Sequence, residues 1–90
     1  RAYLKFEPNN ANFWYESGMV QRVIKRNDES INSLNRALQL NPNLNIAYLE
    51  RARAKAQKGD LAGAQQDYQK AQQLGLKMEA MDEQLMKQLQ

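Results

Sequence analysis

Two prolines 34 residues apart constrain this chain more than any other feature. Pro8 and Pro42 are the only prolines, and each is followed by asparagine and preceded by helix-forming residues, in RAYLKFEP and NRALQLNP. Self-similarity at a fixed period of 20 to 50 residues is typical of solenoids and other repeat arrays. The spacing therefore predicts a repeat of 34 residues.

A shift by this period superposes residues of similar size and polarity. The superposed pairs are Trp14 and Tyr48, Glu16 and Glu50, Gly18 and Ala52, Leu34 and Tyr68, Ala37 and Ala71, and Leu40 and Leu74. Helix formers dominate, and β-branched residues do not alternate, so we expect an all-α chain. The predicted helices are 11–25 and 28–41 in the first repeat, and 45–58 and 61–74 in the second.

The expected turns contain helix-breaking or capping residues. RND, at 26–28, can cap the turn in the first repeat, and KGD, at 58–60, the turn in the second. Gly59 suits the left-handed conformation that ends many helices.

Both copies resemble the tetratricopeptide repeat, whose pattern is W-x2-L-G-x2-Y, then A-x3-F, then P. The first copy carries Trp14, Ser17, Gly18, Gln21, Ser30, Leu34, Ala37 and Pro42, and the second carries Tyr48, Arg51, Ala52, Lys55, Ala64, Tyr68, Ala71 and Leu76. The departures from the pattern are Ser17 and Arg51 for leucine, Gln21 and Lys55 for tyrosine, Leu76 for proline, and Lys25 where glycine is common. The resemblance implies a right-handed α-solenoid of helix-turn-helix repeats.

The repeat divides the chain into four segments. Residues 1–10 are expected to end a preceding partial repeat, 11–44 and 45–77 to form complete repeats, and 78–90 to form a C-terminal capping helix. Met78, Met81, Leu85 and Leu89 recur at helical spacing in that last segment. Because no comparable cap precedes residue 11, we expect a longer array or an open end that pairs with another chain.

The helical wheel of the first helix separates a core face from a second arc. Gly18 is expected to let the second helix approach closely, with Ser30 doing the same from the other side. Phe13 and Trp14 are predicted to be buried, and Val20 and Ile24 to extend their apolar arc. In the tetratricopeptide resemblance, the remaining arc of each first helix lines a concave groove that binds a partner. The predicted groove residues are Asn12, Tyr15, Met19, Arg22, Ile46, Leu49 and Arg53.

Most of the groove residues have a structural alternative. Tyr15, Met19, Leu49 and Ile46 can instead pack between repeats, and the arginines Arg22 and Arg53 can be plain solvated charges. Glu16 and Glu50 border the arc and could neutralise these arginines.

The composition argues against catalysis and against metal or cofactor binding. The chain has no His and no Cys, which removes the commonest general base, the thiol nucleophile and the commonest metal ligands. We therefore expect no enzyme and no cofactor. The Lys, Asn and Arg clamp with which some tetratricopeptide domains hold a chaperone's C-terminal carboxylate is also missing from the groove positions.

An apolar stripe with two arginines suits a protein or peptide partner that has hydrophobic anchors and some acidic character. Self-association is one alternative. RNA binding is a disfavoured second alternative, because the net charge is only +3 and the basic residues point in several directions. They are Arg22, Lys25, Arg26, Arg51, Arg53, Lys55 and Lys58. No apolar run reaches the roughly 20 residues of a membrane span, and the compartment stays open, with the cytoplasm as the default.

Overall fold

The computed structural model describes residues 9–77 and residue 87. Within this part the chain forms helices and no strands. The helices are α2 (Ala11–Val23), α3 (Asn27–Leu40), α4 (Asn45–Lys58) and α5 (Leu61–Gln73). All four predicted helices are confirmed, with ends that differ from the predicted ones by no more than two residues. The predicted capping helix and most of residues 1–10 lie outside the described residues.

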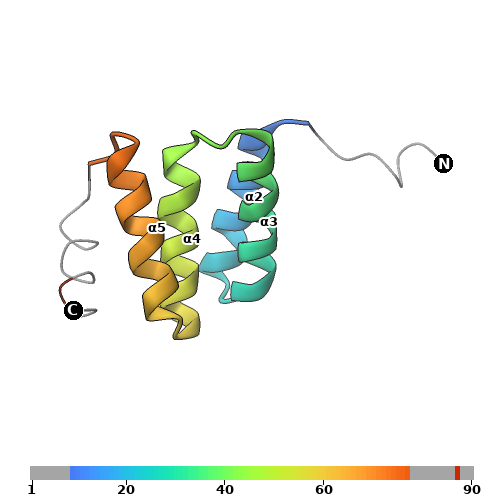
Figure 1. Ribbon diagram of the computed structural model, residues 1–90. Coiled ribbons are helices and arrows are strands. Elements are labelled where there is room, and N and C mark those ends of the chain that lie inside the picture. Colours follow the sequence, from blue (N-terminus) through green and yellow to red (C-terminus); the bar gives the residue numbers. More distant parts are fainter. Residues whose placement is uncertain (1–8, 78–86, 88–90) are drawn as a thin grey trace.

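The four helices form two hairpins that stack side by side (Figure 1). α2 packs against α3 and α4 against α5, while α4 also contacts both helices of the first hairpin. Stacked helical hairpins are the arrangement expected for a helical solenoid, so the predicted fold class is confirmed. No helix among the described residues is long and apolar enough to cross a membrane.

Capping side chains and residues with a positive φ angle determine where the helices begin and end. Asn10 caps α2 by accepting a hydrogen bond from the backbone N–H of Asn12 (2.9 Å), and Asp60 caps α5 through the N–H of Gly63 (3.0 Å). Gly59 ends α4 in the left-handed conformation, as predicted. The expected RND cap is wrong in detail, because Arg26 precedes α3 without a side-chain capping bond.

The left-handed residue of the first turn is Lys25, with φ of 67°. A side chain with a Cβ atom costs about 1–2 kcal/mol in this conformation. The turn therefore stores strain at the position where the repeat pattern commonly has glycine.

The close approach of the two helices in the first hairpin depends on Gly18. A Cβ atom added there would lie 2.6 Å from Cγ of Leu34 and 3.2 Å from the carbonyl oxygen of Ser30. Ser30 Oγ donates a hydrogen bond to the Gly18 carbonyl (2.6 Å). The predicted role of these two small residues is thus confirmed.

Two apolar clusters form the core. One joins the repeats and consists of Leu34, Ala37, Leu38 and Ala47, with Trp14 and Tyr15 packed against it. The other lies within the second hairpin and consists of Leu49, Ala52, Ala64, Tyr68 and Ala71. Trp14 is thus packed, as predicted.

The predicted burial of Phe13 is wrong, and so is the expected packing of Val20 and Ile24. Phe13 is 45% exposed, Val20 56% and Ile24 55%. Phe13 touches the edge of Trp14, with ring centroids 5.3 Å apart and planes at 86°. These side chains extend the apolar arc of α2 to a side that no helix of the described part covers.

Replacing Lys25 with glycine is expected to stabilise the protein by about 1 kcal/mol, because the left-handed residue is then unstrained. Urea unfolding followed by circular dichroism measures the change. Lys70→Gly, on an exposed site in the helical part of α5, is the matched control and should lose about 1 kcal/mol. A Lys25→Gly variant no more stable than the wild type would contradict the strain at this turn.

Replacing Gly18 with alanine is expected to cost about 1–2 kcal/mol, since overpacking outweighs the gain in helix propensity. Thermal unfolding measures this loss. In a Leu34→Ala background the added methyl group has room, so the same substitution should there be neutral or stabilising. An equal loss in both backgrounds would show that Leu34 does not limit the site.

Candidate functional site

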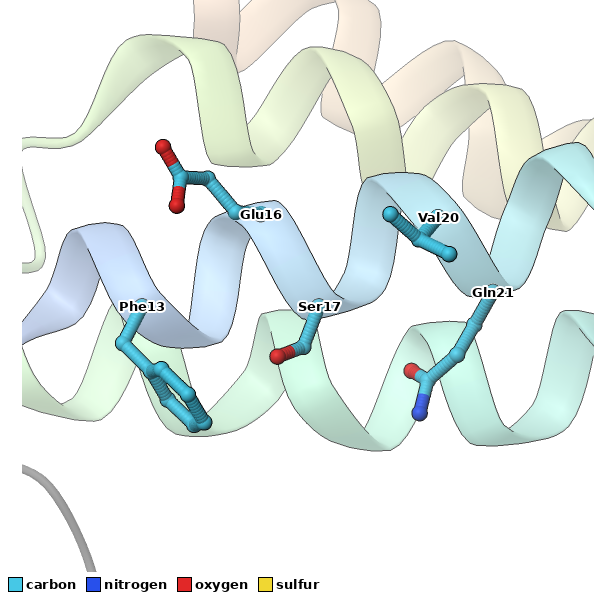
Figure 2. Close-up of a pocket in the computed structure, with 5 residues that line it drawn as sticks. All are labelled: Phe13, Glu16, Ser17, Val20 and Gln21. Carbon is cyan, nitrogen blue, oxygen red and sulfur yellow. The ribbon is translucent and has the colours of Figure 1, made fainter.

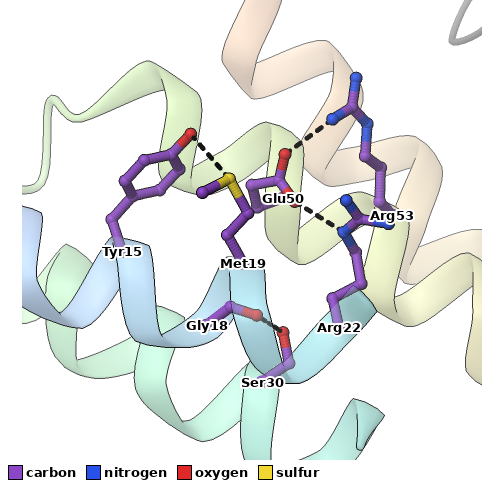
Figure 3. A network of polar contacts seen from close by, with 7 residues as sticks. All are labelled: Tyr15, Gly18, Met19, Arg22, Ser30, Glu50 and Arg53. Atoms are coloured by element: carbon purple, nitrogen blue, oxygen red, sulfur yellow. Dashed lines mark hydrogen bonds and ion pairs between the residues drawn. The ribbon is translucent and has the colours of Figure 1, made fainter. Parts of the chain in front are cut away.

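The surface between α2 and α4 carries most of the predicted groove residues. Tyr15, Met19 and Arg22 come from α2, and Glu50 and Arg53 from α4. Figure 3 shows these five side chains gathered where the first helices of the two repeats meet. We call this set the inter-repeat surface.

A buried carboxylate holds the inter-repeat surface together. Glu50 Oε1 accepts from Nε of Arg22 (2.7 Å), and Glu50 Oε2 accepts from Nη1 of Arg53 (2.7 Å). The Glu50 side chain is 5% exposed, and the two arginines are 18% and 17% exposed. One carboxylate thus joins two guanidinium groups from neighbouring repeats, as dashed lines show in Figure 3. The expected pairing of Glu50 with these arginines is confirmed, whereas Glu16 forms no ion pair with a described residue.

Arg22 keeps hydrogen-bond donors that Glu50 does not use. The single carboxylate of Glu50 is shared by the guanidinium groups of Arg22 and Arg53. Of the Arg22 donors, only Nε forms a hydrogen bond with a described residue. Its two Nη groups can therefore receive a carboxylate from another molecule.

Tyr15 and Met19 form the apolar part of the inter-repeat surface. Both are half-buried, and the Tyr15 hydroxyl donates to Sδ of Met19 (3.8 Å). Burial raises the pKa of the Tyr15 hydroxyl, and the negative charge of Glu50 raises it further, while Arg53 acts in the opposite direction. The phenol therefore stays protonated and remains a hydrogen-bond donor.

The other predicted groove residues lie elsewhere or contribute less. Leu49 is only 8% exposed and belongs to the core of the second hairpin, where it clusters with Ala52 and Tyr68. The structure therefore places Leu49 in the core of its own hairpin, and not in the groove or in the packing between repeats that was the alternative. Ile46 is half-buried in the first turn of α4, and Asn12 is exposed in the first turn of α2.

A second buried carboxylate joins α4 to α5. Asp67 is 4% exposed and accepts from Nε and Nη2 of Arg51 (both 2.8 Å), while Lys55 Nζ lies 3.0 Å away. The guanidinium of Arg51 also reaches Asn35 on α3 (2.9 Å). Neither Asp67 nor this network was predicted. Arg51 and Lys55, which depart from the repeat pattern, could have indicated that a carboxylate lies near them.

The corresponding positions in the first hairpin are neutral. Thirty-four residues before Asp67 and Lys55 stand Ser33 and Gln21, whose side chains hydrogen-bond to each other (2.7 Å). The same contact between the helices of a hairpin is therefore ionic in one repeat and uncharged in the other.

Comparison with known proteins identifies the family to which this sequence is similar. The sequence model of the tetratricopeptide repeat matches residues 11–44 and 46–74. These ranges correspond to the two hairpins, α2 with α3 and α4 with α5. No curated protein matches the chain.

Replacing Glu50 with glutamine is expected to destabilise the protein by about 3 kcal/mol, because two partly buried guanidinium groups then lose their ion pairs with this carboxylate. Urea unfolding gives the value.

Glu29→Gln is the matched control for Glu50→Gln. Glu29 is 56% exposed and pairs with Arg26 at 3.3 Å, so its loss should change stability by less than about 0.5 kcal/mol. Similar effects of the two substitutions would mean that Glu50 does not join the repeats.

Proposed function

The chain belongs to the tetratricopeptide repeat family, and from this premise we propose that its inter-repeat surface binds a peptide segment of a protein partner. Repeats of this family mediate protein–protein interactions, and the family typically provides non-catalytic scaffolds.

The observation that carries the proposal is an apolar patch beside the Arg22 guanidinium, whose two Nη groups form no hydrogen bond with a described residue. Tyr15 and Met19 are half-buried, so a partner can complete their burial without unfolding the protein. Aromatic and methionine side chains are enriched at protein interfaces, and methionine adapts its shape to irregular ligands. The available donors of Arg22 lie one turn further along α2 than Met19.

This combination favours a segment with apolar anchors and an acidic residue. The apolar anchor covers Tyr15 and Met19, and the acidic side chain accepts from the Nη groups of Arg22. The Tyr15 hydroxyl can turn its one hydrogen from Sδ of Met19, a weak acceptor, to a backbone carbonyl of the segment. Because Glu50 already fixes both arginines, little side-chain entropy is lost when the segment binds.

The pairing of the basic residues favours a protein partner over nucleic acid. Arg22 and Arg53 bind Glu50, Arg51 and Lys55 bind Asp67, Arg26 lies near Glu29, and Lys58 binds Asp28. Binding to a nucleic-acid backbone requires Lys and Arg side chains that can replace the counterions of its phosphates. Of the basic residues considered for RNA, Lys25 alone has no carboxylate partner among the described residues.

The proposal is tested by affinity capture from an extract of the source organism with the wild type and with Tyr15→Ala plus Met19→Ala. The double variant is expected to bind the captured partner at least tenfold more weakly, because about 2 kcal/mol of apolar burial is lost. Isothermal titration calorimetry with the purified partner measures the affinity.

Leu61→Ala plus Gln69→Ala is the control, because both side chains are exposed on α5 and outside the inter-repeat surface. This control should bind like the wild type. Circular dichroism confirms that all variants are folded. If the Tyr15 and Met19 double variant captures the same partner with unchanged affinity, the inter-repeat surface is not the binding site.

A further inference from the structure

A second surface lies on the far side of α2 from the inter-repeat surface. An open pocket there is lined by Phe13, Glu16, Ser17, Val20 and Gln21, which Figure 2 shows along one side of the helix. We call these five residues the outer face of α2. Phe13 and Val20 are about half exposed, although both are large and apolar.

The second repeat shows what covers this face when a hairpin precedes it. The counterparts of Phe13 and Val20, 34 residues later, are Ala47 and Ala54. Both alanines are fully buried, and Ala47 clusters with Leu38 of α3. The outer face of α2 is thus equivalent to a face of α4 that the first hairpin covers.

The negative charge of Glu16 on the outer face indicates which side chain the covering helix must carry. The counterpart of Glu16 is Glu50, which receives a guanidinium from Arg22 on the preceding hairpin and another from Arg53, three residues later. Three residues after Glu16 stands the neutral Met19. Glu16 is exposed and forms no ion pair with any residue the structure describes. A helix that covers Glu16 must therefore supply the cation itself, since burying an unpaired carboxylate is strongly unfavourable.

A second copy of this chain does not supply that cation. If its second hairpin stacked on the outer face as the first hairpin stacks on α4, Ala56 would stand in the place of Arg22 and Gln72 in the place of Leu38. Glu16 would then be buried without a counter-charge, and an amide would face Phe13. The described hairpins are therefore mismatched to head-to-tail self-association.

We propose that the outer face of α2 binds a helical hairpin from outside the described residues whose first helix pairs an arginine with Glu16. Its second helix covers Phe13 and Val20 with side chains smaller than Leu38, because these two residues are larger than the alanines of the second repeat. This surface is separate from the inter-repeat surface, so the failure of one proposal would not contradict the other.

An extended chain tests the proposal with a probe of known sequence. A copy of residues 9–42 replaces residues 1–8, so that the added hairpin precedes Asn9 with the natural Pro-Asn junction. The added copy carries Leu38→Ala to make room for Phe13, and its Arg22 then faces Glu16 of the original chain. A double-mutant cycle combines Glu16→Gln with Arg22→Ala in the added copy.

Each single substitution is expected to lower the midpoint of thermal unfolding of the extended chain by about 3–5 °C, and the double substitution by little more than either alone. In the original chain Glu16→Gln should shift the midpoint by less than about 1 °C, because Glu16 is exposed there. Additive effects in the extended chain, or none, would overturn the arginine pairing.

Thiol labelling shows directly whether the added hairpin docks. The chain has no cysteine, so Val20→Cys in the original repeat gives a single reactive thiol. Its labelling rate is expected to fall at least tenfold in the extended chain relative to the original chain. Equal rates would overturn the proposal, and so would a concentration-dependent dimer of the original chain, seen by sedimentation, that protects this thiol.

Discussion

The ion pairs of Glu50 are the interaction on which the rest of the structure depends. Its carboxylate is nearly inaccessible to solvent and binds one arginine from each of the two neighbouring first helices. A buried charge is tolerated only with well-placed partners, so this contact fixes the rotation and separation of α2 and α4. It also orients Arg22, whose Nη groups form no hydrogen bond with a described residue, on the surface that Tyr15 and Met19 share. The geometry of the stack and the chemistry of the proposed binding surface thus share one cause.

The two hairpins meet the same packing requirement with different chemistry. Gly18 and Ser30 let α2 and α3 approach in the first, whereas Ala52 and Ala64 are fully buried against Tyr68 in the second. Between the helices, an uncharged pair in the first repeat is replaced by the Asp67 network in the second. A repeat therefore preserves volume and spacing, while its polar contacts vary with the residues available on the neighbouring helix.

The sequence predicts the helices and their pairing well, because these depend on local signals. Helix propensity and the small residues Gly18 and Ser30 act within one hairpin, and the proline spacing gives the repeat length directly from the sequence. Phe13 and Leu49 show where such reasoning ends. A helical wheel gives the direction of each side chain but does not say whether another helix lies there. Phe13 points to a side that no described helix covers, while Leu49 is enclosed by the second hairpin's own core. The Asp67 network was missed for a related reason, since it needs residues from α3, α4 and α5 together.

Methyl NMR of Met19 tests the central claim most directly, because this side chain lies on the proposed binding surface next to Tyr15. The chain carries isotope-labelled methionine methyl groups, a Met19→Leu variant assigns the Met19 signal, and the captured partner segment is added as a synthetic peptide. The account predicts that the Met19 signal shifts saturably, with the affinity measured by calorimetry. An unchanged Met19 signal at saturating peptide would contradict binding at the inter-repeat surface.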